Sequence, residues 1–180
     1  MRIIVFAAYY QPHVGGYCKN IHELSRRLVE RGHSVVVVTC NTEGRKAVEA
    51  IDDILVIRLP SWELLNDSFP VPKPSRMLWD MRDIMAVDLV LTQTRFFPTS
   101  LLGCIYSIVK NVPLIHVERG TVHTVMDNKI LGFLAQVYDH TIGTFIVKHA
   151  KRNVGVSQAA CRFVEHIGGK NTQTIYNGIE

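Results

Sequence analysis

Two uncharged, β-branched segments on either side of one amphipathic segment constrain the fold of this chain most strongly. Ile3–Ala8 and Ser34–Cys40 contain no charged residue, which is typical of strands buried on both faces of a parallel sheet. Between them, apolar residues recur every three or four positions from Tyr17 to Leu28, and Gly32 follows. This spacing predicts a helix that ends at the glycine. The order strand, helix, strand predicts a right-handed βαβ unit.

The same alternation continues along the rest of the chain. Further strands are predicted at 54–59, 88–92, 113–117, 153–156 and 172–176, and helices at 75–86, 99–110, 128–151 and 158–167. Ser75 and Thr99 are the expected N-caps of two of these helices. Pro60 to Pro74 contains four prolines and is predicted to be an irregular surface loop. Helical crossovers between parallel strands place helices on both sheet faces, so the predicted fold class is α/β with a doubly wound parallel sheet.

Length and composition narrow the possible partners. A chain of 180 residues with 47% hydrophobic residues is expected to form one globular domain. Twenty Lys and Arg against sixteen Asp and Glu give a net charge of +4, and the basic residues are dispersed. This modest excess suits phosphates or an anionic lipid surface, but an ordinary solvated basic face is the favoured interpretation. No nucleic-acid partner is expected.

Cysteine spacing and targeting signals indicate the compartment. The four cysteines contain no CxxC pair, so we expect buried, reduced thiols. The first residues lack a full secretory apolar region and cleavage site. The nearly uncharged stretch Phe96–Val109 is too short to span a membrane. We therefore expect a cytoplasmic protein that at most touches a membrane at its periphery.

Three places follow predicted strands, where open parallel sheets bind ligands. The first is the loop YYQPHVGG, residues 9–16. Gly15 and Gly16 have no Cβ, so backbone N–H groups can approach a phosphate at the start of the next helix. A simple chain turn explains the glycine pair equally well, and the GxGxxG spacing of dinucleotide sites is absent.

The second place is HVERGTVHT, residues 116–124. Glu118, Arg119 and His123 supply a carboxylate, a fixed cation and a titratable base, and they are the candidate catalytic residues. His116 alternates within the strand, so a hydrogen-bonded core histidine is the favoured interpretation. No two histidines share a helix face beside a carboxylate in a metalloprotease pattern, so no metal site is predicted.

The third place is TIYNGIE at residues 174–180. Asn177 and Gly178 tolerate left-handed backbone angles and predict a sharp turn, interpreted as a hinge. A loose terminal turn is the ordinary alternative. Ser157 occupies a similar position after a strand, and its favoured role is the N-cap of the following helix.

These places occur in the order seen in a known family. Residues 1–39, with a strand, a P…GG loop, a helix, RGH and a valine-rich strand, together with VGVSQ and TIYNGIE, resemble the amino-terminal half of the retaining glycosyltransferases of family 4. The resemblance spans essentially the whole chain. It implies that residues 1–180 form a single Rossmann-like, acceptor-side domain of the GT-B architecture, and that the C-terminal nucleotide-sugar-binding domain is absent from this chain.

The resemblance also implies roles for individual residues. Gly15 and Gly16 would approach the donor's diphosphate, while Tyr10 and His13 would belong to the acceptor-side loop. The family usually has a histidine in a glutamate, histidine, glycine context where VERG places Arg119 in this sequence. Either Arg119 replaces that group with a permanent charge, or His123 supplies the imidazole; an arginine cannot act as a base.

The implied activity is transfer of a sugar from a nucleotide-diphosphate sugar to a lipid or carbohydrate acceptor, with no cofactor and no metal. The isolated domain is expected to be inactive. A stand-alone sugar- or phosphate-binding module and half of a nucleotide-sugar epimerase are the alternatives. The segment 128–151 is favoured as a core helix over a membrane-surface helix, although its apolar residues and terminal lysines leave the second possibility open.

Overall fold

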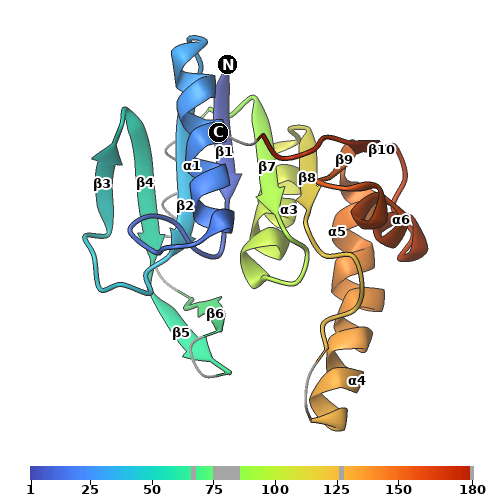
Figure 1. Ribbon diagram of the computed structural model, residues 1–180. Coiled ribbons are helices and arrows are strands. Elements are labelled where there is room, and N and C mark those ends of the chain that lie inside the picture. Colours follow the sequence, from blue (N-terminus) through green and yellow to red (C-terminus); the bar gives the residue numbers. More distant parts are fainter. Residues whose placement is uncertain (66–67, 75–85, 126–127, 179–180) are drawn as a thin grey trace.

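The computed structural model describes residues 1–65, 68–74, 86–125 and 128–178. Eight of the described strands form one sheet in the order β10-β9-β8-β7-β1-β2-β4-β3 (Figure 1). They are β1 (Arg2–Phe6), β2 (Ser34–Cys40), β3 (Val48–Ile51), β4 (Ile54–Leu59), β7 (Leu89–Gln93), β8 (Leu114–Glu118), β9 (Arg152–Gly155) and β10 (Thr172–Thr174). All neighbours are parallel except β3 and β4. The direction of winding reverses between β1 and β7, which confirms the predicted doubly wound α/β class.

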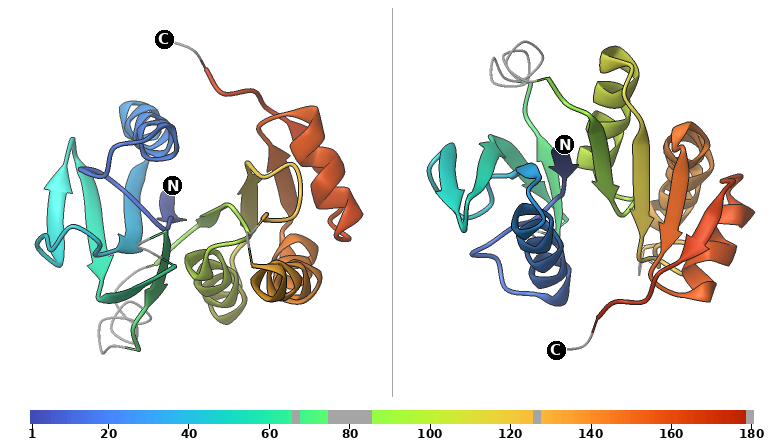
Figure 2. Two further views of the ribbon diagram at one scale, coloured as in Figure 1. Left: turned by 60° about the horizontal axis from the view of Figure 1, so that its bottom comes forward. Right: turned by 90° about the horizontal axis from the view of Figure 1, so that it is seen from above.

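The helices cover both faces of this sheet. They are α1 (Gly16–Glu30), α3 (Pro98–Lys110), α4 (Lys129–Tyr138), the π-helical turn η1 (Asp139–Gly143), α5 (Thr144–His149) and α6 (Gln158–His166). Helix α1 lies on one face, and α3 and α5 lie on the opposite face (Figure 2). Helix α6 packs beside α5 through Phe163 and Val164 against Val147. This arrangement is the expected result of right-handed crossovers on either side of the reversal point.

Strand β1 lies at the centre of the core because helices cover both of its faces. Ile4 and Phe6 pack in the cluster that includes α3, whereas Ile3 and Val5 pack in the cluster that includes α1. Because successive side chains of a strand point to opposite faces, a strand covered on both sides needs apolar residues at every position. The uninterrupted apolar runs in the sequence therefore identified β1 and β2 correctly.

The segment after β4 differs from the prediction. Instead of an irregular loop, Ser61–Leu64 (β5) and Phe69–Pro72 (β6) form a two-stranded antiparallel ribbon in which Trp62 pairs with Val71. A ribbon of two strands has only edge strands, and a proline is tolerated where its missing N–H would face outward. The prolines therefore did not exclude a strand here. Strand β3 was also not predicted, since its alternating exposed and half-buried residues lack the apolar run that marked its neighbours.

Several predicted boundaries shift by one or two residues. Strand β10 ends at Thr174 rather than at position 176. The N-cap of α3 is Phe97, with Pro98 at the first helical position, and the predicted cap Thr99 is instead buried in the first turn. Ser157 caps α6 as predicted and accepts a hydrogen bond from the N–H of Ala160 at 3.1 Å. The predicted helix 75–86 and its cap Ser75 lie outside the described residues, except position 86.

The four cysteines are buried and free, as expected. Burial raises the pKa of the Cys18 and Cys104 thiols to about 11 and that of Cys40 to about 12. These thiols are therefore protonated near neutral pH and behave as small apolar core residues.

The segment 129–149 is helical throughout but is not the uniform core helix that the sequence favoured. Its second part contains the fully buried Ile146 and Val147, whereas in α4 only Ala135 is buried. Ile130 is 71% exposed and Phe133 is 64% exposed, and α4 extends away from the sheet in Figure 1. By length and composition Lys129–His149 could cross a membrane, but a spanning orientation would require its second part to leave the core.

Candidate functional site

The three predicted places lie after β1, β8 and β10. Strands β1, β7 and β8 are neighbours in the sheet, so the loops after them leave from adjacent positions of one edge. This edge includes the point where the winding direction reverses, which is where doubly wound sheets bind ligands.

The loop after β1 is open at its glycine end. Gly15 is the N-cap of α1, with an extended backbone (φ 166), so this position does not require the positive φ that favours glycine. An added Cβ at Gly15 or Gly16 would meet no atom within 4 Å. Together with neighbouring loop residues and Lys19, the glycines line a pocket of about 530 Å³. The open space on the glycines, and not their backbone angles, is therefore what a ligand could use.

The two other residues predicted for this loop have different environments. Tyr10 is buried, and its hydroxyl lies 2.8 Å from Nδ1 of His22, whose Nε2 lies 3.0 Å from Asp52. This burial argues against direct contact of Tyr10 with an acceptor. His13 lines the pocket, stacks on Tyr9 and lies 3.1 Å from Glu43. Its position is compatible with ligand contact.

Glu118 ends β8 as a fully buried carboxylate surrounded by donors. It accepts hydrogen bonds from the backbone N–H groups of Arg119 (2.8 Å), Gly120 (2.7 Å) and Arg95 (3.2 Å), and the guanidinium of Arg95 lies 3.2 Å away. His116 Nε2 lies 3.3 Å from the same carboxylate. The predicted core histidine is thus confirmed, because His116 is fully buried and also bonds Thr92.

These contacts set the protonation state of Glu118. Burial alone would raise its pKa, but the hydrogen bond and charge of His116, the charge of Arg95 and the N–H of Gly120 outweigh it and lower the pKa to about 2. The carboxylate is therefore ionised near neutral pH, and both of its oxygens already accept hydrogen bonds. Gly120 is needed for this packing, since an added Cβ would lie 2.7 Å from Arg95 Nη1. In this geometry Glu118 positions the loop; its predicted catalytic role stays a prediction.

Arg119 connects the second and third predicted places with α1, the helix that follows the first place. Its guanidinium donates to Asn20 on α1 (3.2 Å), to Gln93 at the end of β7 (3.1 Å) and to Asn177 near the chain's end (3.3 Å). It also lies 5.5 Å from the ring of Tyr17, in the first turn of α1. The cation is thereby fixed beside the helix whose N-terminus carries the two glycines.

The surroundings of Arg119 leave part of its hydrogen-bonding capacity unused. Burial lowers the pKa of Arg119 from its usual value, although an arginine remains charged under all ordinary conditions. Its Nε and the amide nitrogen of Gln93 are buried and have no partner among the described residues. Unpaired buried donors are costly, so a bound anion or hydroxyl that accepted from them would be favoured.

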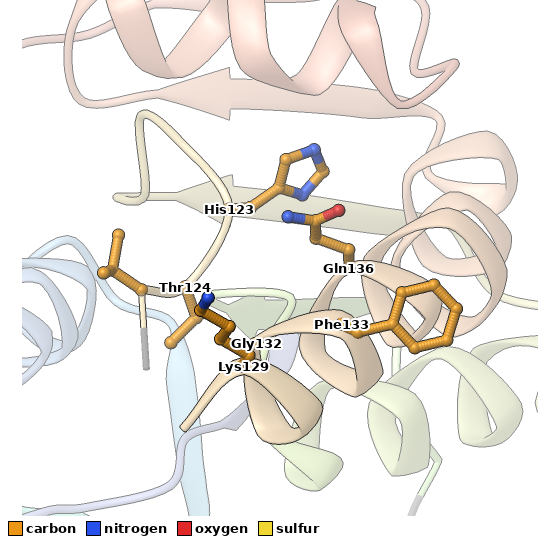
Figure 3. A pocket seen from close by; sticks show the side chains of 7 residues that line it. His123, Thr124, Lys129, Gly132, Phe133 and Gln136 are labelled. Atoms are coloured by element: carbon orange, nitrogen blue, oxygen red, sulfur yellow. The ribbon is translucent and has the colours of Figure 1, made fainter. Parts of the chain in front are cut away.

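His123 lies in a different cluster from Arg119. Its Nδ1 is 2.8 Å from Asp139 of η1, and its ring contacts those of His140, Phe163 and His166. Figure 3 shows His123 facing Gln136 across a pocket between its loop and α4. That pocket has a volume of about 390 Å³ and is lined by His123, Thr124, Val125, Lys129, Gly132, Phe133 and Gln136.

The buried charges that support these residues were not predicted from the sequence. Arg95 donates to both carboxylate oxygens of Asp139 at 3.0 Å and also contacts Glu118. The signal for Arg95 was its place directly after a strand, in TQTR. Asp139 carried no such signal, because it lies inside a long apolar helix pattern. Gln93 and Asn20 were also missed, since neither belongs to a recognisable motif.

Comparison with known proteins gives the family. The family described as "Glycosyltransferase Family 4" matches residues 14–180. An uncharacterized glycosyltransferase of Methanocaldococcus jannaschii is 32% identical over the whole chain, which covers 48% of that protein. The alpha-monoglucosyldiacylglycerol synthase of Streptococcus pneumoniae is 31% identical over 69% of the chain and 27% of its own length. An MMP alpha-(1→4)-mannosyltransferase of Mycolicibacterium hassiacum is 30% identical over 73% of the chain and 30% of its own length.

Solved structures agree on the fold. Anabaena HepE in complex with UDP and glucose has a TM-score of 0.66 and 16% identity over the whole chain, which covers 45% of HepE. Sucrose-phosphate synthase from Thermosynechococcus elongatus has a TM-score of 0.65 and 15% identity over 99% of this chain and 48% of its own. The chain thus spans at most about half the length of the proteins it resembles, with the Rossmann-like fold found in GT-B glycosyltransferases. We conclude that the chain belongs to glycosyltransferase family 4.

Proposed function

We propose that this chain is the acceptor-side, N-terminal domain of a retaining glycosyltransferase. In this proposal a second, C-terminal domain holds the nucleotide, and the complete protein transfers a sugar from a nucleotide-diphosphate sugar to a lipid or carbohydrate acceptor. The relatives support both acceptor classes, since one is named a mannosyltransferase and another a glucosyldiacylglycerol synthase. The fold neighbour HepE was solved with UDP-glucose, which supports a nucleotide-sugar donor.

The observation that carries the proposal is the position of the Arg119 guanidinium. It lies against Tyr17 and Asn20 in the first turns of α1, so a fixed positive charge is added to a helix N-terminus that already favours anions. Lys19 lines the pocket at the same helix end. A diphosphate leaving group gains negative charge as its bond to the sugar breaks, and oriented cations and N–H donors stabilise that charge.

The geometry favours Arg119 over His123 for this role. The described partners of Arg119 come from α1, β7 and the last residues, whereas those of His123 come from η1 and α6. Arg119 cannot accept a proton, so its contribution is charge stabilisation and hydrogen bonding to phosphate or sugar oxygens. Because arginine and backbone donors supply that charge, we propose that the transfer step itself needs no metal and no cofactor.

The decisive experiment measures sugar transfer by the full-length protein with a panel of nucleotide sugars and both acceptor classes. We expect Arg119→Ala to lower kcat/KM at least 100-fold, about 2.7 kcal/mol, and Arg119→Lys to recover only part of it. The matched control is Arg162→Ala, an exposed arginine on α6, which should change kcat/KM less than twofold. Unchanged transfer by Arg119→Ala would refute the role of Arg119.

Further measurements on the same protein test the remaining parts of the proposal. The anomeric configuration of the product, followed by NMR, should match that of the donor sugar. The 180-residue chain alone should give no transfer, and a rate near that of the full-length protein would contradict the two-domain proposal. Conversion of the nucleotide sugar without any acceptor would indicate an epimerase instead.

The exposed apolar residues of α4 support a further part of the proposal, peripheral contact with a cytoplasmic membrane surface. Ile130, Phe133 and Leu134 are all more than half exposed, and Lys129 precedes them, a combination found in helices that bind lipid interfaces. Flotation with anionic liposomes should recover the chain at low salt. Replacement of Ile130 and Phe133 by Ser should abolish recovery of the chain with the liposomes. If the parent chain shows no salt-sensitive binding, the proposed membrane contact is wrong.

A further inference from the structure

Three histidines from separate parts of the chain meet beside the loop after β8. His123 belongs to that loop, His140 to η1 and His166 to the last turn of α6. Their ring centroids are 5.0 to 5.7 Å apart, and one ligand atom of each lies within 4.8 Å of the others. Seventeen and 26 residues separate them in sequence, so their spacing forms no motif.

The distances are close to those of a metal site. Nitrogen ligands bind zinc at about 2.0–2.1 Å in tetrahedral geometry, which places pairs of nitrogens about 3.3 Å apart. His140 and His166 are exposed, so small side-chain rotations can bring their nitrogens to that separation. Three histidines with a fourth position open to solvent are a common coordination set for zinc.

Asp139 prepares His123 to act as a ligand. Its Oδ2 lies 2.8 Å from Nδ1 of His123, so Nδ1 carries the proton and the lone pair of Nε2 remains available. A carboxylate that orients a histidine in this way is a regular feature of metal sites. Asp139 is itself fixed, because Arg95 donates to both of its oxygens at 3.0 Å.

The charge of the surroundings also favours a cation. Arg95 is the counterion of two fully buried carboxylates, Glu118 and Asp139. His116 lies beside Glu118 as a further partner, whereas Asp139 shares Arg95 with Glu118. A divalent ion bound by neutral imidazoles next to Asp139 would add a positive charge beside that carboxylate.

The π-helical turn places His140 in the cluster. Residues 139–143 form one π turn within a helix that is otherwise α-helical, and such turns occur frequently at functional sites. Here the turn contains both the positioning residue Asp139 and the candidate ligand His140. Phe163 packs edge-on against His123 at 5.0 Å and closes one side of the cluster.

From these observations we propose that His123, His140 and His166 bind a divalent transition-metal ion, with zinc as the best match, and that Asp139 is the positioning residue. The ion would join the loop after β8 to η1 and α6. This site is separate from the Arg119 contacts and does not depend on the proposed transfer reaction.

The test uses the full chain without a histidine tag, stripped of metal with a chelator. Titration with Zn²⁺ against a chromophoric chelator should show one tight site per chain, and Co²⁺ should give the visible absorption of a tetrahedral complex. His140→Ala and His166→Ala should each weaken Zn²⁺ binding at least tenfold. The matched control His149→Ala, an exposed histidine at the end of α5, should leave binding unchanged.

Two outcomes would overturn the proposal. The first is Zn²⁺ binding by the parent chain no stronger than by the double variant His140→Ala, His166→Ala. The second is tight binding that both single variants retain, which would place the ion elsewhere. Circular dichroism checks that the variants are folded; since both replaced side chains are exposed, we expect parent-like spectra.

Discussion

Two loops at the same edge of the sheet are built in opposite ways. The loop after β8 begins at a buried network of charges, in which Arg95, Glu118 and Asp139 are at most 2% exposed. The loop after β1 is open at its glycine end, and its one described ion pair, His13 with Glu43, is 39% exposed at each side chain. Charged and titratable side chains therefore fix the backbone of the loop after β8, whereas those of the loop after β1 remain solvated.

The loop after β8 therefore supports the site, whereas the loop after β1 offers a surface that a ligand can contact. Glu118 holds the backbone N–H groups of Arg119 and Gly120, so the direction in which Arg119 leaves the sheet is set before any ligand arrives. Preorganised charges need little rearrangement on binding, which is how they contribute to affinity and rate. The glycine loop supplies open space instead, and its contribution to binding depends on the ligand that enters it.

Removal of Arg95 should give the largest effect on stability. Arg95→Met leaves two buried carboxylates without their counterion, so we expect the free energy of unfolding to fall by about 3 to 5 kcal/mol. Urea denaturation of the 180-residue chain measures this loss. The control Arg26→Met breaks partly exposed pairs on α1 with Glu23 and Glu30 and should cost less than about 1 kcal/mol. Equal losses in the two variants would erase the contrast between buried and exposed charges.

Acid titration should separate Glu118 from the other carboxylates. Its pKa of about 2 in the folded chain lies below the ordinary value of 4.5, so its stabilising effect is complete above pH 4.5 and is lost as the pH falls through 2. Glu118→Gln should therefore cost about 3 kcal/mol at pH 7, and this difference should shrink between pH 4.5 and pH 2. A difference that does not change over that interval would contradict the lowered pKa.

The glycine loop should show the reverse pattern, a binding effect with little change in stability. Because an added Cβ at Gly15 or Gly16 meets open space, the double change Gly15→Val, Gly16→Val should alter the free energy of unfolding by no more than about 1 kcal/mol. In the full-length protein it should weaken nucleotide-sugar binding at least tenfold, about 1.4 kcal/mol. Calorimetric titration measures the affinity, and unchanged affinity would remove the phosphate role.

Val14 provides the matched control for that variant. It is 94% exposed in the same loop and also lines the pocket, so Val14→Leu enlarges a neighbouring side chain without adding a Cβ to either glycine. Nucleotide-sugar affinity should stay within twofold of the parent. A loss as large as that of the glycine variant would show that any enlargement of this loop interferes with binding.

The smallest effect is expected at the exposed ion pair. Glu43→Gln removes the charged partner of His13, and solvent screening limits the cost to less than about 0.5 kcal/mol. Urea denaturation at low salt should detect little or no shift of the midpoint. A loss near that of Glu118→Gln would mean that this loop is as rigidly fixed as the loop after β8.

The fold could be predicted because its signals are local. The apolar runs of β1 and β2 and the helical spacing of α1 follow from burial on two faces, and each lies within a few consecutive residues. Strand β3 and the ribbon of β5 and β6 escaped prediction because edge strands are half exposed and tolerate proline. Their positions depend on pairing with strands formed elsewhere.

The site could be predicted only where its residues follow strands. Arg119 and Gly15 carried such a signal, and the contact of Arg119 with Asn177 links two of the predicted places. Asp139 and His140 carried none, because they lie within an apolar helix pattern. Their partnership with His123 arises only when the helix packs against the sheet, a long-range event that spacing within the chain does not reveal.

The single π turn makes the length of the segment 129–149 as important as its chemistry. A π turn already holds one residue more than an α turn, and an α-helix advances about 100° per residue, so a further residue inserted in Asp139–Gly143 would rotate α4 against α5 by that angle. Asp139 could then stay with Arg95, or Ile146 could stay in the core, but not both. We therefore expect natural variation here to exchange side chains freely on the outer surface while further insertions are selected against.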